Sequence, residues 1–460
     1  MTNYLLVDIG STYTKLTAVN LDRADIIGTG RHYTTVDSDV RIGYERALRL
    51  LEEKTGIQDF KRIYACSSAA GGLKMAALGL VEELTVEAAK RVCLGAGGKV
   101  DLIYSHQITM QEALKIKNGK IDIVLLAGGT DGGNSECVLH NAKVLGEAEL
   151  TIPIVYAGNK SCQDEISNIF KKYKLNGWIC ENVMPRLNQL RINSARDVIK
   201  NIFLNNIVSA KGIKKIEAEI DGVLLPTPGA VLRAAELFSK GYLHEAGLGE
   251  MVLVDIGGAT TDIYSIASGN PKRPNAFLRG LEEPFGKRTV EGDLGMRLSA
   301  PGIVKNLSEE ELLLFSEKGI DLLAETELRY QNQSSLPQSE RETEIDHLLG
   351  SLCCDIAFSR HVGSMETIYT PLGVMYYQSG KDLTDVKYVV GTGGIIIHDE
   401  KPLEILSKVV VDSKKPLELR PRNPEFMLDR DYILSAMGLL SIEHPEIAIR
   451  IMKKRIGIIK

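Results

Sequence analysis

The chain has 460 residues, of which 44% are hydrophobic and 25% are charged, a balance typical of a globular protein with a sizeable core. Its formal net charge of −5 gives no general attraction to nucleic acid or to an anionic membrane, so neither is expected as a partner. No apolar run approaches the roughly 20 residues of a membrane-spanning helix and the N-terminus has no basic signal-peptide region, so we expect a cytoplasmic protein.

The first predicted elements are three strands in a meander, over residues 4–8, 14–20 and 25–33, followed by a helix that ends at Gly56. A tight turn joins the first two strands. Its sequence reads Val7-Asp8-Ile9-Gly10-Ser11-Thr12-Tyr13-Thr14-Lys15. Small residues at such a turn let backbone N–H groups approach phosphate oxygens, because no side chain blocks them. The predicted phosphate contacts are Gly10, Ser11, Thr12 and, through its ammonium group, Lys15.

Strands and helices alternate over the next part of the chain, which implies parallel pairing. A strand over 61–65 ends in a Gly-rich loop at 67–72, and an Ala- and Leu-rich stretch predicted to be helical follows. A strand over 121–126 ends in a second Gly-rich loop at 128–133. These two loops are either ordinary turns at strand ends or extra contacts near a phosphate group.

The meander returns in the second half of the chain. A helix over 228–238 precedes strands at 251–255 and 261–266, with a third strand expected at 276–280. The turn between the first two reads Val254-Asp255-Ile256-Gly257-Gly258-Ala259-Thr260-Thr261-Asp262. One such turn is compatible with a simple hairpin. Two copies favour two similar lobes that face one phosphate-bearing ligand.

The repeated aspartates suggest a metal and a catalytic role. Mg²⁺ keeps most of its waters and accepts few carboxylates, so Asp8 and Asp255 are the predicted residues that hold it. In the second turn the predicted phosphate contacts are Gly257, Gly258 and Thr260. The ligand that fits these features is a nucleoside triphosphate with Mg²⁺.

A third glycine loop follows a strand predicted over 387–390. It consists of Gly391, Thr392, Gly393 and Gly394, and it either lies beneath an adenine and ribose or is a plain turn into a helix. Gly292-Asp293 is a further candidate for approaching the nucleotide. Arg360 and His361 could flank the base, but a solvated helix face is the favoured interpretation for both. Residues 307–347 are acidic and polar, which predicts a solvated surface.

The order of these motifs resembles the actin-like ATPase superfamily, which includes Hsp70, actin and the sugar kinases. The resemblance implies a two-lobed α/β fold in which each lobe has a mixed five-stranded sheet, an antiparallel meander followed by parallel strands, with flanking helices. The implied domains are residues 1–240 for the first lobe, 241–430 for the second with its acidic segment, and 431–460 for C-terminal helices that return to the first lobe.

Within that superfamily, four segments make the chain similar to the accessory protein family of adenosylcobalamin-dependent glutamate mutase, called MutL and unrelated to the mismatch-repair protein. The segments are Ser67–Leu73, Leu126–Gly133, Pro226–Leu232 and Val290–Arg297. This resemblance implies an ATP-binding and ATP-hydrolysing chaperone that protects or reactivates a mutase. The expected partners are the mutase subunits, with a homodimer as one possible assembly.

Three alternatives stay open at this point. The first turn is also similar to activators of radical-type dehydratases, but those hold an iron–sulfur cluster with cysteines, and the seven cysteines here lack such an arrangement. A small-molecule kinase would need a catalytic base, for which Asp131, Glu236 and Asp262 are candidates without a convincing motif. The third alternative is an actin-like filament or scaffold protein.

Overall fold

The computed structural model describes residues 2–10, 12–35, 39–68, 73–210, 219–371 and 373–459. The chain divides into two compact units. Unit 1 comprises residues 1–22, 26–230 and 280–282, and unit 2 comprises residues 23–25, 231–279 and 283–460. No helix among the described residues combines the length and apolar character needed to cross a membrane.

The first sheet of unit 1 begins with the predicted meander. Its strands, in the order β10-β4-β1-β2-β3, are β1 (Asn3–Ile9), β2 (Tyr13–Asn20), β3 (Asp25–Tyr33), β4 (Arg62–Ser67) and β10 (Gly222–Pro226). β1 and β2 are antiparallel, whereas β4 pairs in parallel with both β1 and β10. The predicted meander followed by parallel strands is therefore confirmed for this unit, with β10 as a strand that the sequence did not reveal.

A second five-stranded sheet lies in the same unit, and all of its strands are parallel. Its order is β6-β5-β7-β8-β9, with β5 (Leu73–Gly79), β6 (Gly98–Ser105), β7 (Ile123–Leu126), β8 (Ile154–Tyr156) and β9 (Gly177–Ile179). The prediction of a helix after residue 72 is wrong, because that segment is β5. Five of its seven residues are buried in succession, and a strand covered on both faces has no alternating pattern.

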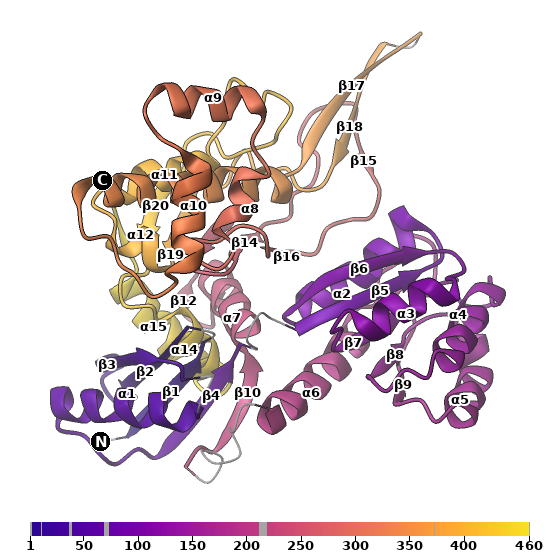
Figure 1. Cartoon of the computed structure of the whole chain (residues 1–460), viewed down its shortest axis with the longest axis horizontal. Helices are drawn as coiled ribbons and strands as arrows, with labels where there is room; N and C mark the ends of the chain where they lie inside the picture. Colours follow the sequence, from indigo (N-terminus) through magenta and orange to yellow (C-terminus); the bar gives the residue numbers. More distant parts are fainter. Residues whose placement is uncertain are drawn as a thin grey trace. The chain divides into compact units, whose positions relative to one another are not determined.

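Seven α-helices accompany the two sheets of unit 1 in its described part. They are α1 (Val40–Thr55), α2 (Glu87–Gly95), α3 (Met110–Asn118), α4 (Glu136–Glu147), α5 (Gln163–Lys172), α6 (Asn193–Ala210) and α7 (Thr227–Lys240), the last of which continues into unit 2 (Figure 1). One apolar core includes Val7 of β1, Tyr44 of α1, Met75 of β5 and Ile199 of α6, so both sheets of this unit contribute to it.

Unit 2 repeats the meander and the parallel strands. Its main sheet has the order β16-β14-β13-β19-β20-β21, with β13 (Met251–Ile256), β14 (Thr261–Ile266), β16 (Gly286–Glu291), β19 (Tyr388–Thr392), β20 (Glu425–Leu428) and β21 (Gly457–Ile458). β14 lies between β13 and β16 and is antiparallel to both, and β19 is parallel to β13 and β20. The predicted lobe pattern is confirmed, but the sheet has a sixth strand, β21, that runs antiparallel to β20.

The third strand of this meander lies later in the sequence than expected. Residues Ala276–Arg279 form β15, which pairs in parallel with β18 (Gly373–Ser379) in a separate sheet completed by β17 (Ser364–Thr370). The strand that pairs with β14 is β16. Figure 1 shows the β17–β18 hairpin extending away from the main sheet of unit 2.

The remaining elements of unit 2 are helices and two short strands. They are β11 (Gly241–Tyr242), β12 (Glu245–Ala246), α8 (Ala300–Val304), α9 (Glu309–Glu317), α10 (Leu322–Gln331), α11 (Glu340–His361), α12 (Gly394–His398), α13 (Pro402–Leu406), α14 (Leu434–Leu440) and α15 (Pro445–Arg455). The prediction that residues 307–347 are a solvated surface holds for α9, which buries no residue. Most of residues 323–344 is exposed as well, but one side of α10 is buried through Leu322, Thr326 and Arg329, and so is Asp346 near the start of α11.

Candidate functional site

The first Asp turn is a hairpin whose geometry depends on a glycine. The Gly10 amide donates to the Tyr13 carbonyl over 3.0 Å, and a Cβ on Gly10 would lie 2.5 Å from that same oxygen. Asp8 pairs with Lys15 across β1 and β2, so the predicted carboxylate and ammonium residues are direct cross-strand neighbours. Thr12 is exposed at the turn, whereas Ser11 lies outside the described residues.

The Asp8 carboxylate is 7% exposed and receives a hydrogen bond from a distant part of the chain. The Thr227 hydroxyl, on the first residue of α7, donates to Asp8 Oδ1 over 2.7 Å. Cys66 Sγ, on the neighbouring strand β4, lies 3.6 Å from the same oxygen. Burial, followed by the charge of Asp8, raises the pKa of the Cys66 thiol well above its ordinary value, so Cys66 is a neutral thiol beside the carboxylate.

The second Asp turn has the same hairpin hydrogen bond. The Gly257 amide donates to the Thr260 carbonyl over 2.9 Å, and Asp255 pairs with Asp262 across β13 and β14. Asp262 is buried and does not face solvent: Arg288 donates to its Oδ1 over 2.7 Å, and the Thr260 hydroxyl donates to its Oδ2 over 3.1 Å. Asp255 is therefore the partly exposed carboxylate of this turn.

The predicted adenosine loop lies beside the second turn within unit 2. β13 and β19 are parallel neighbours and place Asp255 opposite Thr392, so the turn and the loop follow the same ends of adjacent strands. Gly393 has φ = +95°, and a Cβ there would lie 2.4 Å from the Ile256 carbonyl oxygen and 2.9 Å from Asp255 Oδ1. Only glycine allows this close approach of the loop to the carboxylate.

Asp429, which the sequence analysis did not single out, connects the glycine loop at 391–394 to α14. The Asp429 amide donates to the Gly391 carbonyl over 3.0 Å, and the Asp429 carboxylate accepts the amides of Ile433 and Leu434 before α14 and at its start. Asp429 is 1% exposed. The sequence pattern that could have identified Asp429 is its position a few residues before a predicted helix, where aspartate is a common N-terminal cap.

Several predicted site residues are placed differently from expectation. His361 is fully buried and bonded to Ser265 and Thr289, so it lies neither on a solvated helix face, as favoured, nor beside a base. Arg360 pairs with Asp293 over 2.8 Å and also with Glu291. Gly71 and Gly72 of the first Gly-rich loop lie outside the described residues.

The second Gly-rich loop, at 128–133, is held by amide side chains of unit 1. Asn182 donates to the Gly129 carbonyl over 3.0 Å and to Asp131 Oδ1 over 2.9 Å. The Gly132 amide donates to Asn159 Oδ1 over 3.0 Å. Asp131 thus accepts hydrogen bonds from outside its loop, from the Asn182 side chain and from the Lys160 amide. Glu236, another base candidate, has its carboxylate 3.7 Å from the Lys240 ammonium.

All seven cysteines are buried free thiols. Burial raises the pKa of each of them. Among the described residues, no three His, Cys, Asp or Glu side chains gather as ligands of one metal ion. Oxygen donors are available at both turns, where carboxylates and hydroxyls of the type that Mg²⁺ accepts follow the strand ends.

Comparison with known proteins places the whole chain in one family. The family model described as MutL protein matches residues 4–456. The chain is also 49% identical over 457 residues to Protein MutL from Clostridium tetanomorphum, and the match covers 99% of both chains.

Solved structures are only remotely similar. The diol dehydratase-reactivating factor in its nucleotide-free form has 11% identity and a TM-score of 0.37, with 96% of this chain and 100% of that chain covered. The activator of 2-hydroxyisocaproyl-CoA dehydratase from Clostridium difficile, with bound ADPNP, has 10% identity and a TM-score of 0.34, with both chains fully covered. The strand orders of the two units, not these remote likenesses, carry the fold assignment.

Proposed function

This chain belongs to the MutL protein family, and we propose that it is an ATP-binding and ATP-hydrolysing accessory protein that reactivates an adenosylcobalamin-dependent mutase. One observation carries the nucleotide part of the proposal. The same Asp turn follows a central strand in each main sheet. In unit 2, Gly393, which has a positive φ, lies against the Asp255 carboxylate of that turn.

The chain's own residues suggest how phosphate groups are bound. Gly10 and Thr12 in one turn, and Gly257 and Gly258 in the other, lie at hairpin ends, where Thr12 is exposed and the three glycines are partly exposed. Lys15 is the cross-strand partner of Asp8, and its ammonium group would neutralise phosphate charge. Mg²⁺ held through Asp8 and Asp255 would supply electrostatic stabilisation of the transferred phosphoryl group.

Binding and hydrolysis of MgATP test this proposal directly. Asp8→Asn and Asp255→Asn each keep the side-chain shape but remove a charge, and each should lower Mg²⁺-dependent hydrolysis about 10²-fold or more. Asp59→Asn, at an exposed position of unit 1, is the matched control and should behave as wild type. Wild-type turnover in both site variants would contradict the assignment.

The partner is proposed from the family and from the sequence segments that resemble the glutamate mutase accessory proteins. Purified glutamate mutase inactivated with cyanocobalamin supplies the test. The protein with MgATP and free adenosylcobalamin should restore mutase activity and release the bound cyanocobalamin, whereas the Asp255→Asn variant should not. No recovery with MgATP would overturn the reactivase role, and equal recovery with and without ATP would overturn its dependence on ATP.

Two rival functions find less support among the described residues. A kinase needs a free catalytic base, but Asp131 and Asp262 are bonded to neighbouring groups inside their own units. An activator of the dehydratase type would need cysteines at the surface for an iron–sulfur cluster, and here every thiol is buried. These observations favour an ATPase whose output is a conformational change in a partner.

A further inference from the structure

The second Asp turn is held from outside its own hairpin by a short segment of unit 2. The Met296 amide donates to the Gly257 carbonyl over 3.0 Å, and the Arg297 amide donates to the Gly258 carbonyl over 2.8 Å. The Ser299 hydroxyl donates to the Ala259 carbonyl over 2.6 Å. Three successive carbonyls of the turn are therefore fixed by residues 296–299, and a shift of this segment would move the turn.

The Arg297 side chain connects that segment to α11. Its Nη2 donates to Asp346 Oδ2 over 2.8 Å, its Nη1 to the Met296 carbonyl over 2.8 Å and its Nε to the Ser335 carbonyl over 3.2 Å. The side chain is 15% exposed, so these bonds have little competition from water. Arg297 thus contacts the turn through its backbone and α11 through its guanidinium group.

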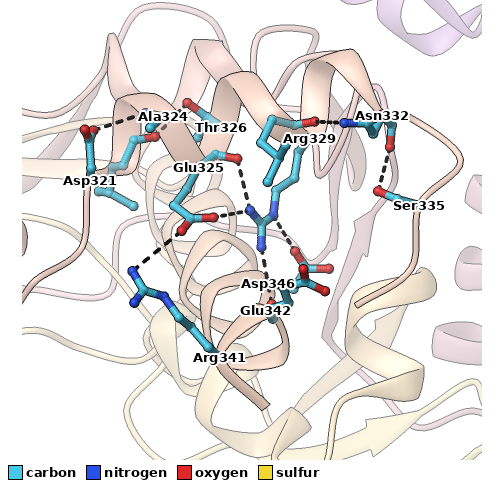
Figure 2. Close-up of polar contacts among 12 residues, drawn as sticks. Asp321, Ala324, Glu325, Thr326, Arg329, Asn332, Ser335, Arg341, Glu342 and Asp346 are labelled. Carbon is cyan, nitrogen blue, oxygen red and sulfur yellow. Dashed lines mark hydrogen bonds and ion pairs between the residues drawn. The ribbon is translucent and has the colours of Figure 1, made fainter. Parts of the chain in front are cut away.

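Asp346 is shared with a second arginine, on α10. Arg329 Nε donates to Asp346 Oδ1 over 2.6 Å, and Arg329 Nη1 donates to the carboxylate of Glu325 over 2.8 Å. Arg329 Nη2 donates to the Glu342 carbonyl over 3.3 Å. Figure 2 shows the Arg329 guanidinium lying between Glu325 and Asp346, with Arg341 at the outer side of Glu325. Each Asp346 oxygen accepts from a different arginine.

Burying these charged side chains costs free energy of desolvation, so the network is not explained by stability alone. Arg329 and Asp346 are each 5% exposed, and apolar side chains of similar volume are often more stabilising at such sites than a buried ion network. Charge-assisted hydrogen bonds differ from apolar contacts because they are directional. The network therefore constrains the positions of α10 and α11 relative to residues 296–299. Apolar contacts alone would allow a wider range of positions.

We propose that Arg297, Asp346 and Arg329 are positioning residues of the second Asp turn, through which α10 and α11 set its geometry. This inference rests on the proposed ATP site and names a means of regulating it. A partner protein that shifts α10 would alter the turn without touching the nucleotide. Three contacts link α10 to the turn: Arg329 of α10 bonds to Asp346, Asp346 bonds to Arg297, and the Arg297 amide bonds to the Gly258 carbonyl.

Hydrogen exchange tests the network without relying on nucleotide. In Arg329→Gln the exchange rates of the Met296 and Arg297 amides should rise about tenfold, the effect of weakening one charge-assisted hydrogen bond. Amides of β13, such as Val254, should keep their protection. Arg341→Gln is the matched control, because its side chain is 69% exposed and 4.0 Å from Glu325, and it should leave all these rates unchanged.

Unchanged exchange at Met296 and Arg297 in Arg329→Gln, or an equal rise throughout β13, would overturn the inference. Should Arg329→Gln fail to fold, Arg297→Lys provides the same comparison, because it keeps the charge and the backbone donor but loses the fork of donors. The Kd for MgATP, measured on the same variants, should rise in Arg329→Gln and not in Arg341→Gln. A wild-type protein that binds no nucleotide would refute the proposed function. The exchange rates would still show whether the network positions residues 296–299.

Discussion

Thr227 donates a hydrogen bond of 2.7 Å to Asp8, although the two residues are 219 positions apart in the chain. Thr227 is the first residue of α7, and Asp8 is the carboxylate of the first turn. This bond holds Oδ1 of the Asp8 carboxylate and so helps to fix the orientation of that side chain. The start of α7 is therefore part of the first turn's architecture and not merely a connection between strands.

Replacing Thr227 should weaken nucleotide binding without removing any group that contacts the nucleotide. Thr227→Val has almost the same shape but no hydroxyl, and loss of a hydrogen bond to a carboxylate costs about 1.5–3 kcal/mol. We expect the Kd for MgATP to rise about tenfold or more, as measured by calorimetric titration. Thr227→Ser keeps the donor and should bind as wild type. Equal affinity in Thr227→Val would show that Asp8 needs no support from α7.

Gly393→Ala tests the approach of the glycine loop to the second turn. The residue has φ = +95°, and a Cβ would lie 2.4 Å from the Ile256 carbonyl oxygen, so both conformation and space oppose a side chain. The free energy of unfolding should fall by about 1–3 kcal/mol, measured by urea titration, and MgATP affinity should fall with it. Gly394→Ala is the neighbouring control. Its Cβ would meet only the Tyr432 hydroxyl at 3.8 Å, so its free energy of unfolding should match that of the wild type; Gly394→Ala is a control for stability alone, because Gly394 is itself a predicted nucleotide contact.

The local features of the site could be predicted from sequence because they depend on neighbouring residues. An apolar run, an aspartate and small residues favour a strand followed by a tight turn through local preferences, and both turns are present as predicted. The helix stop at Gly56 is of the same kind: Gly56 has φ = +69° and its amide donates to the Glu52 carbonyl.

Features that depend on distant residues could not be read in this way. The bond from Thr227 to Asp8 and the shared carboxylate of Asp346 require knowledge of which elements pack together. The third strand of the second meander was misplaced for a related reason. A short run at 276–279 has the composition of a strand, and only pairing decides that it joins β18 and that β16 completes the meander.

Acid should destabilise unit 2 through His361. Burial, with Lys287 and Lys381 nearby, lowers the pKa of this imidazole well below its ordinary value of 6.5. The unfolded chain then binds a proton that the folded chain does not bind, so stability is lost as the pH falls below about 6.5. We expect the slope of unfolding free energy against pH, between pH 6.5 and 5, to be larger in wild type than in His361→Asn. Identical slopes would show that the folded protein accommodates the charged imidazole.

The buried thiols make a prediction about chemical reactivity. All seven cysteines are buried, and a thiol with a raised pKa is a poor nucleophile at neutral pH. In the native protein, a disulfide reagent such as dithionitrobenzoate should therefore react slowly with all seven thiols, whereas in guanidinium chloride it should titrate seven at once. The rate in the native state should follow opening of the structure, so MgATP should slow it further if nucleotide stabilises the fold. One or more thiols that react immediately in the native protein would contradict their burial and would reopen the case for a surface metal cluster.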